Sequence, residues 1–253
     1  MNTRFVLNRD FPRLQHVPHL DLLFPARRLL RLRLGSCTLG NVEREALGVF
    51  REETDVPGWL IPALYRQYLR TGEAGELRRV FYHNLEDIVS LVTLATRLCS
   101  RFALDGNSAS VPDQLHPIDL VSLGRAYERL GWTAASEDAY RRALEDALPP
   151  DARERALGGL ALLLKRQGRR EEAAHLWRLW TESASDASLT PFIELAKHHE
   201  WHVPDIPAAV NWANQAVQRV GAWRPSSRRS LTLSELEHRL NRLQHKLMNG
   251  AEA

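Results

Sequence analysis

The 253-residue sequence predicts a mainly α-helical protein, and three observations support that fold class. From Thr38 onward, apolar residues recur every three or four positions, the spacing that places them on one face of a helix. Glycines and prolines stand at the ends of these periodic segments, where they stop and start helices. In the second half of the sequence a pattern of small and aromatic residues repeats, which is typical of stacked helical hairpins.

The earliest part of the sequence, residues 1–35, reads as irregular chain with a short apolar run. The first predicted helix begins at Thr38, whose side chain can cap it, and ends at Gly48. A second helix is predicted over about residues 62–70, because a proline suits its first turn and a glycine follows its end.

A third and longer helix is predicted to start near Glu76. Its apolar stripe consists of Leu77, Phe81, Leu85, Ile88, Val92 and Ala95, widened by Leu91, Leu94 and Leu98. Residues 104–117 are rich in Gly, Ser, Asn and Pro and contain little apolar material, so we assign them as a linker and domain boundary.

Residues 118–220 are predicted to form about three tetratricopeptide-like repeats. Gly131 and Gly168 stand 37 positions apart (168 − 131), close to the period of roughly 34 residues for such repeats. A third, degenerate copy covers 195–217. Small residues would let the two helices of a hairpin approach, and aromatic residues would fill the groove between hairpins.

The final segment, 231–248, is predicted to be an amphipathic helix that closes the open end of the repeats. A basic linker, residues 223–230, precedes it, and Thr232 with Glu235 forms a capping-box pattern. Pairing of its leucine stripe with another chain is the alternative, which we favour less because the stripe is short.

Composition adds limits on the class of protein. Hydrophobic residues make up 44% of the sequence and charged residues 26%, an ordinary globular balance, and the net charge of +3 permits contact with nucleic acid without requiring it. The two cysteines, Cys37 and Cys99, have no metal-like spacing. No apolar signal segment or membrane-length run is present. We therefore expect a soluble, cytoplasmic protein that makes no membrane contact.

Four pieces of the first hundred residues occur in an order and spacing that form a specific set: "HLDLL" (19–23), "SCTLGNVEREALG" (36–48), "DVPGWLIPALYRQYL" (55–69) and "HNLEDIVSL" (83–91). Together they resemble the distal half of a YprB-type ribonuclease H-like domain, from the DEDD superfamily of 3′–5′ exonucleases. The resemblance implies that residues 1–103 are the C-terminal, helical part of an α/β domain.

The resemblance also implies a chemistry. Nucleases of this superfamily hold two divalent metals, Mg²⁺ or Mn²⁺, between four carboxylates, and a Tyr or His one turn before the fourth carboxylate activates water. By resemblance Asp87 is that fourth carboxylate and a metal ligand, and His83, on the same helical face, is the catalytic general base.

The sequence departs from the superfamily pattern in one respect: the three earlier carboxylates are not found. We therefore expect a chain truncated at its N-terminus and inactive as a nuclease by itself, since one aspartate cannot hold two metals. The first hypothesis is a fragment of a divalent-metal nuclease that acts on nucleic acid. The second is a non-catalytic scaffold that holds a protein or peptide partner through its helical repeats.

Several other residues allow a functional and a structural interpretation. Asp21 is expected to be structural, and Glu43 with Glu45 to form a solvated helix face. The "HHEWH" stretch, His198 to His202, has metal-ligand spacing but no evident third ligand, so we favour a structural role. Four tryptophans and four arginine pairs could contact bases and phosphates, but we favour core and ordinary surface roles for Trp177, Trp180, Trp201, Trp212, Arg27–Arg28, Arg141–Arg142, Arg169–Arg170 and Arg228–Arg229.

Overall fold

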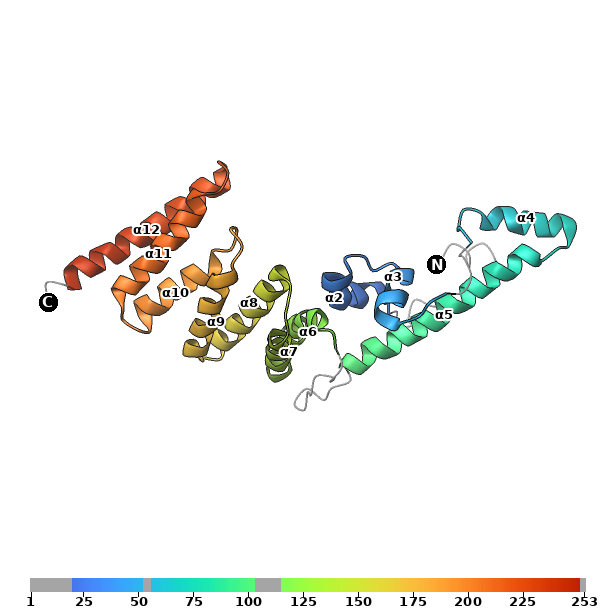
Figure 1. Ribbon diagram of the computed structural model, residues 1–253, viewed down its shortest axis with the longest axis horizontal. Helices are drawn as coiled ribbons and strands as arrows, with labels where there is room; N and C mark the ends of the chain where they lie inside the picture. The colour runs from blue at the N-terminus through green and yellow to red at the C-terminus, as the bar shows by residue number, and fades with distance from the viewer. Residues whose placement is uncertain (1–19, 52–55, 103–114, 251–253) are drawn as a thin grey trace, which may run out of the picture. The chain divides into compact units, whose positions relative to one another are not determined.

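The structure is a computed structural model that describes residues 20–51, 56–102 and 115–250, and all regular structure within these ranges is helical (Figure 1). The predicted mainly α fold class is confirmed. The chain divides into two compact units, Met1–Ser100 (unit 1) and Arg101–Ala253 (unit 2). Within the described ranges, no helix combines the length and the apolar character that a membrane crossing requires.

The regular structure described in unit 1 consists of helices. They are α2 (Leu23–Leu34), α3 (Leu39–Val42), the π-helical turn η2 (Glu43–Leu47), α4 (Ile61–Thr71) and α5 (Gly75–Phe102), of which the last two residues belong to unit 2. The two predicted helices of 38–48 and 62–70 are therefore present, and the third starts one residue earlier than predicted. Gly72 ends α4 with φ +74°, a conformation that favours glycine, and its N–H donates to Tyr68 O.

Two local predictions in unit 1 are wrong. Residues 1–35 were expected to be irregular, but α2 occupies the end of that range. Pro25 falls in the first turn of α2, where its missing N–H would have had no intrahelical acceptor, so it does not break the helix. Thr38 stands at the N-cap position of α3, yet its side chain makes no capping hydrogen bond.

Unit 2 is a row of helical hairpins followed by one long helix (Figure 1). The hairpins are α6 (Pro117–Leu130) with α7 (Thr133–Glu145), α8 (Pro150–Arg166) with α9 (Arg170–Ser183), and α10 (Thr190–Trp201) with α11 (Ile206–Gly221), and α12 (Ser227–Gly250) packs on α11. These hairpins lie in the part of the chain for which about three repeats were predicted. Their assignment as tetratricopeptide-like stays a prediction. Most of the predicted linker 104–117 lies outside the described residues.

Tyr140 shows why small residues stand at set positions in the hairpins. Its side chain is 2% exposed and fills the space beside α6 and α8. A Cβ added at Gly124 would lie 2.9 Å from the Tyr140 ring, and one added at Gly159 would lie 2.5 Å from its Cζ. The close approach predicted between helices therefore depends on these glycines.

The helix α12 closes the last hairpin. Leu236 packs with the cluster of Phe192, Ala216 and Val220, and Leu243 packs with Ala196, Ala209 and Ala213. The helix begins at Ser227 rather than at 231, so Thr232 lies inside it and does not cap it. Ser226 does this instead, since its Oγ accepts a hydrogen bond from Arg229 N at 3.1 Å.

A buried carboxylate also joins α12 to α10. The Glu200 side chain is fully buried and accepts hydrogen bonds from Arg242 Nη2 at 2.8 Å and Lys246 Nζ at 2.7 Å, with Arg239 Nη1 at 3.5 Å. Burial by itself raises the pKa of Glu200, but the hydrogen bonds from Lys246 and Arg242 outweigh it, so this pKa lies below the ordinary value. We name these four residues the Glu200 clamp.

Candidate functional site

The two residues assigned to catalysis by resemblance lie one turn apart on α5. His83 and Asp87 share a helical face, and His83 Nε2 is 3.4 Å from Asp87 Oδ2. Both side chains are partly exposed, His83 at 27% and Asp87 at 31%. The helical register predicted from the sequence therefore brings them together.

A third residue, Arg51, contacts both this pair and Glu43 of the π-helical turn η2. It follows η2 in a loop, and its guanidinium donates from Nη1 to His83 Nδ1 at 2.6 Å and from Nη2 to Asp87 Oδ1 at 2.6 Å. It also donates to both carboxylate oxygens of Glu43, from Nε at 2.8 Å and from Nη2 at 2.7 Å. We call Glu43, Arg51, His83 and Asp87 the Arg51 cluster.

Glu43 corrects a prediction made from the sequence. It was expected on a solvated face, but it is 1% exposed. Glu45 is exposed, as expected, and forms an ion pair with Arg44. The carboxylate can be buried because Arg51 supplies a cation and two charge-assisted hydrogen bonds. A signal was present: Glu43 is four residues from both Leu39 and Leu47, in the middle of the apolar stripe.

The hydrogen bonds of the Arg51 cluster assign the protonation pattern of the histidine. A guanidinium only donates, so His83 Nδ1 must accept from Arg51, and the proton of the neutral ring stands on Nε2, facing Asp87. Neither ring nitrogen then offers a lone pair to a water molecule. In this arrangement His83 orients Asp87, and action as a general base would require Arg51 to move away.

Comparison with known proteins agrees with the resemblance seen in the sequence. A family model described as RNase H superfamily matches residues 1–99. The chain is also similar to the uncharacterized protein YprB of Bacillus subtilis (strain 168), with 30% identity over 225 residues. That match covers 86% of this chain and 51% of the relative, so the chain spans about half the length of the curated relative it matches.

The described residues do not form the two-metal centre of the superfamily that the chain resembles, and the sequence analysis expected this site to be incomplete. Among them, no group of three or more His, Cys, Asp or Glu side chains is placed to hold a metal ion. Asp87 has one oxygen bonded to Arg51 and the other beside His83, and both Glu43 oxygens bond to Arg51. Arg51 therefore occupies carboxylate oxygens that a divalent cation would need as ligands. Binding of Mg²⁺ or Mn²⁺ by Asp87 stays a prediction.

The remaining acidic and histidine candidates have structural surroundings. Asp21 precedes α2, and its Oδ1 accepts a hydrogen bond from Leu23 N at 2.9 Å. His198 is 2% exposed and belongs, in the described chain, to no three-ligand group. Burial is the main cause of the lowered pKa of His198, and His199 and His202 lower this pKa further. Glu171, whose Oε1 is 3.5 Å from His198 Nε2, acts in the opposite direction and raises it.

The tryptophan and arginine candidates divide into core, ion-pair and exposed residues. Trp177 and Trp180 are buried and Trp212 is partly buried against Phe192, as predicted, whereas Trp201 is 55% exposed. Several arginines of the predicted pairs bond to protein groups, namely Arg141 with Glu137 and Glu172, Arg142 with Asp138, Arg169 with Glu137 and Glu172, and Arg229 with the last carbonyls of α11. Arg27 and Arg28 are exposed on α2, a helix with no acidic residue.

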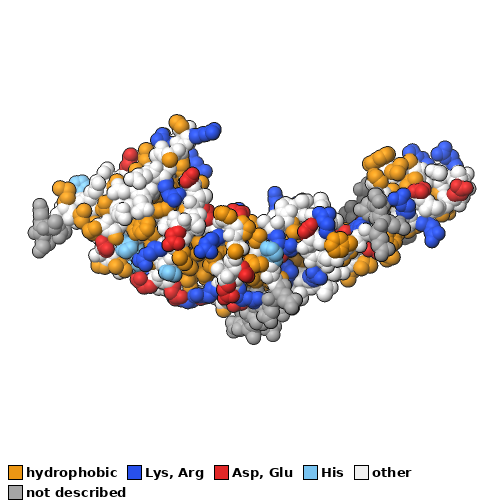
Figure 2. All heavy atoms as spheres, in the orientation of Figure 1, with side chains coloured by type: hydrophobic (Ala, Val, Ile, Leu, Met, Phe, Trp, Pro, Cys, Tyr) orange, Lys and Arg blue, Asp and Glu red, His pale blue; other side chains and the backbone are white. Residues whose placement is uncertain are grey.

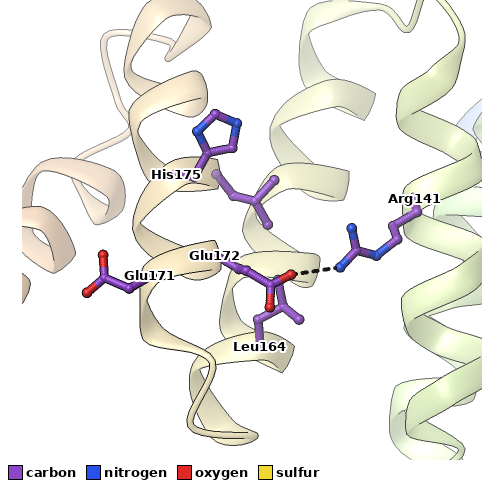
Figure 3. A pocket seen from close by; sticks show the side chains of 6 residues that line it. Arg141, Leu164, Glu171, Glu172 and His175 are labelled. Atoms are coloured by element: carbon purple, nitrogen blue, oxygen red, sulfur yellow. Dashed lines mark hydrogen bonds and ion pairs between the residues drawn. The ribbon is translucent and has the colours of Figure 1, made fainter.

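Unit 2 contains a groove that the sequence did not indicate. It has a volume of about 300 Å³ and is lined by Arg141 of α7, Leu164 of α8, and Glu171, Glu172, His175 and Leu176 of α9. Figure 3 shows Arg141 and Glu172 pointing toward each other across it, at 3.1 Å, while Glu171 points away. Hydrogen bonds from Arg169 and Arg141 lower the pKa of Glu172, so this wall of the groove is charged.

Proposed function

We propose that this chain is part of a nuclease of the RNase H superfamily that acts on nucleic acid, and that the 253-residue chain by itself does not cleave phosphodiesters. The match of residues 1–99 to the family model of the RNase H superfamily supports the first part. The Arg51 cluster supports the second, because Arg51 bonds to one oxygen of Asp87 and the described residues contain no group of three or more side chains placed to hold a metal. In the whole protein we assign Asp87 to the metal and His83 to the attacking water, in a 3′–5′ exonuclease of the DEDD type.

The surface best suited to nucleic acid in unit 1 is the exposed face of α2. Arg27, Arg28 and Arg31 lie within about 100° of the helix circumference at 3.6 residues per turn. All three are exposed, and the opposite face buries Ala26, Leu29 and Leu30. No acidic residue of α2 competes for these guanidinium groups. A row of this kind fits the phosphates of a nucleic-acid backbone, which it would bind without reading sequence.

Fluorescence anisotropy with a labelled single-stranded oligonucleotide tests the nucleic-acid contact. We expect binding that weakens as salt is raised, and the triple variant Arg27→Gln, Arg28→Gln, Arg31→Gln should lower the slope of log K against log salt by about 2, roughly 0.7 for each lost contact. The control replaces three exposed arginines of unit 2 and changes the net charge equally: Arg125→Gln, Arg129→Gln, Arg155→Gln. An equal loss in both triple variants would contradict a specific role for α2.

A cleavage assay with the same oligonucleotide tests the catalytic part. With Mg²⁺ or Mn²⁺ added, we expect no cleavage above that of the buffer. Cleavage that needs metal and disappears in Asp87→Asn would show that the chain is active by itself, and the nuclease assignment would stand while its inactivity would not. Cleavage that Asp87→Asn leaves unchanged would point to a contaminating nuclease.

A second function, a scaffold that binds a protein partner, is favoured by the groove of unit 2. The groove combines the apolar side chains of Leu164 and Leu176 with charged groups of both signs, a composition suited to a short peptide. Peptides selected for binding to the chain should lose at least tenfold affinity with Leu176→Arg and keep it with Leu162→Arg, an exposed leucine of α8 outside the groove. Equal effects of the two changes would rule the groove out.

A further inference from the structure

Trp201 differs from the other tryptophans of the helical hairpins because its side chain faces solvent. It is 55% exposed, whereas Trp177 and Trp180 are buried and Trp212 packs against Phe192. The sequence analysis favoured a core role for all four tryptophans, and that prediction is wrong for Trp201. An indole ring is a large apolar group, so leaving it in water forfeits free energy that burial would supply. Packing therefore does not explain the placement of Trp201 at the end of α10.

Trp201 shares the solvent side of α10 with two charged residues. Glu194 and Lys197 stand seven and four residues before it, so at about 100° per residue the three side chains lie within about 60° of the helix circumference. Lys197 Nζ donates to Glu194 Oε1 at 2.7 Å, and Glu194 also accepts a hydrogen bond from Lys165 of α8. The opposite face of α10 buries Phe192, Leu195 and Ala196.

The Glu200 clamp continues this surface onto α12. Glu200 directly precedes Trp201, and its carboxylate is in contact with Arg239, Arg242 and Lys246. The carboxylate is buried, but the side chains of Arg242 and Lys246 are 42% and 44% exposed. The three cations stand at steps of three and four residues, so they share one face of α12.

These side chains form one basic surface, which we call the basic strip: Lys165, Lys197, Arg239, Arg242, Lys246 and Trp201. Its five cations surround two carboxylates, Glu194 and Glu200, which leaves a net charge of +3 (5 − 2). Glu194 is 15% exposed and Glu200 is fully buried, so the strip presents cations rather than carboxylates to solvent. The exposed Glu235 stands one turn before Arg239 and limits the strip at that end.

Positive charge alone does not single out the basic strip. In the view of Figure 2, Lys and Arg side chains are spread over both units and lie among acidic ones. The strip differs because it places an exposed aromatic ring within a row of cations from three helices that ion pairs join. Proteins that hold single-stranded nucleic acid combine the same two elements, since cations bind the phosphates and a ring stacks on a base. An acidic peptide would engage the cations without needing the ring.

We propose that the basic strip is a binding site for single-stranded nucleic acid, in which the cations hold phosphates and Trp201 stacks on a base. The site belongs to unit 2 and goes beyond the contact proposed for α2. It depends neither on that contact nor on nuclease activity, because it rests on residues of unit 2 alone. Phosphate contacts and stacking do not read base identity, so the site binds without sequence preference.

Fluorescence anisotropy with the full chain and a labelled single-stranded oligonucleotide tests the stacking contact. Trp201→Ala should weaken binding at least about fivefold, the low end of what one stacked base contributes. The matched control is Trp59→Ala, which removes the same side chain from a position of unit 1 that is 80% exposed, and it should leave the affinity unchanged. An abasic oligonucleotide of equal length keeps the phosphates without the bases, so Trp201→Ala should not alter its binding.

The double variant Lys197→Gln, Lys246→Gln tests the phosphate contacts. Each carboxylate keeps a partner in this variant, because Lys165 and Arg242 still bond to them, and circular dichroism checks that the helices are retained. The slope of log K against log salt should fall by about 1.4, roughly 0.7 for each lost contact with a single strand. The control pair Arg125→Gln, Arg129→Gln removes the same charge from exposed positions of α6 and should leave the slope unchanged.

Three results would overturn the proposal, and they are distinguishable. Equal losses in the two charge pairs, or in Trp201→Ala and Trp59→Ala, would exclude the basic strip and leave the contact of α2 standing. An abasic oligonucleotide that binds as tightly as the natural one would show a site for acidic chains in general, not for nucleic acid. No binding of either oligonucleotide would overturn both this proposal and the contact proposed for α2.

Discussion

Removal of the Arg51 guanidinium should destabilise the contact between η2 and α5 more than any surface ion pair of unit 1 would. In Arg51→Met the Glu43 carboxylate, 1% exposed, loses the cation and both charge-assisted hydrogen bonds. Removing one partner of a buried ion pair costs about 3–5 kcal/mol, because the remaining charge has left water without compensation. Loss of the bond to Asp87 adds less, since that side chain is 31% exposed and water can solvate it.

Hydrogen exchange measured by mass spectrometry is the suitable assay, because a chain of two units does not unfold in one step. At about 1.4 kcal/mol per tenfold change, the peptides of η2 and the middle of α5 should lose roughly two to four orders of magnitude of protection. The control Arg44→Met breaks an ion pair whose members are 57% and 48% exposed, and it should change the free energy of opening by under about 1 kcal/mol.

The double variant Glu43→Leu, Arg51→Met separates the buried charge from the packing. Replacing a buried ion pair by apolar side chains of similar size is often neutral or stabilising, by about 1–4 kcal/mol, so most of the lost protection should return. Equal protection loss in Arg51→Met and Arg44→Met would refute the reasoning. A double variant no more protected than Arg51→Met would show that the penalty does not come from the Glu43 carboxylate that lost its guanidinium.

Three further predictions concern unit 2. Gly159→Ala should destabilise unit 2 by about 1–2 kcal/mol in urea unfolding, because the added Cβ would lie 2.5 Å from Tyr140 and this overpacking outweighs the gain in helix propensity. The control Gly221→Ala has open space around its added Cβ and should not destabilise unit 2. Glu200→Gln should lower the free energy of unfolding by about 3 kcal/mol. Because the pKa of Glu200 is lowered in the folded chain, the stabilisation by the wild-type clamp is fully present above the ordinary carboxyl pKa and is lost as pH falls through the folded pKa. Because the pKa of His198 is lowered in the folded chain, below about pH 6.5 the imidazole binds a proton more readily in the unfolded chain. The free energy of unfolding should therefore fall on acidification, by at most about 1.4 kcal/mol per pH unit for this one proton. In unfolding measured between about pH 7.5 and 5.5, His198→Leu should flatten that slope.

Local signals were enough to predict many helix boundaries. Helix α4 follows the proline and glycine at its ends, and Gly131 ends α6 with φ +76°, as the hairpin pattern requires. These features depend on the backbone of a few neighbouring residues, which the sequence shows directly. Helix α2 was missed for the converse reason: Pro25 stops a helix in its interior but is tolerated in its first turn, and the position within the turn depends on where the helix begins.

The Arg51 cluster shows the limit of such reasoning. His83 and Asp87 are one turn apart and were predicted together, whereas Arg51 is separated from Asp87 by 36 residues and meets it only when the loop after η2 folds back. Residues 52–55, which follow Arg51 in the sequence, lie outside the described residues. Periodicity places Glu43 within the apolar stripe, but its charge led to the prediction of a solvent-exposed position. Only the long-range cation makes its burial possible.

The Arg51 cluster is better understood as a determinant of how α5 is rotated than as a source of stability. Apolar contacts alone would hold α5 in several rotations, because its apolar residues cover both the exposed face and the buried positions Leu94 and Leu98. A turn of about 100° would carry Asp87 away from Arg51 and bring Ile88 toward a buried carboxylate–guanidinium pair. Such a placement leaves charged groups without their hydrogen bonds and is therefore disfavoured. The polar cluster thus fixes which face of α5 points outward, and that face carries Phe81, Leu85, Ile88 and Val92.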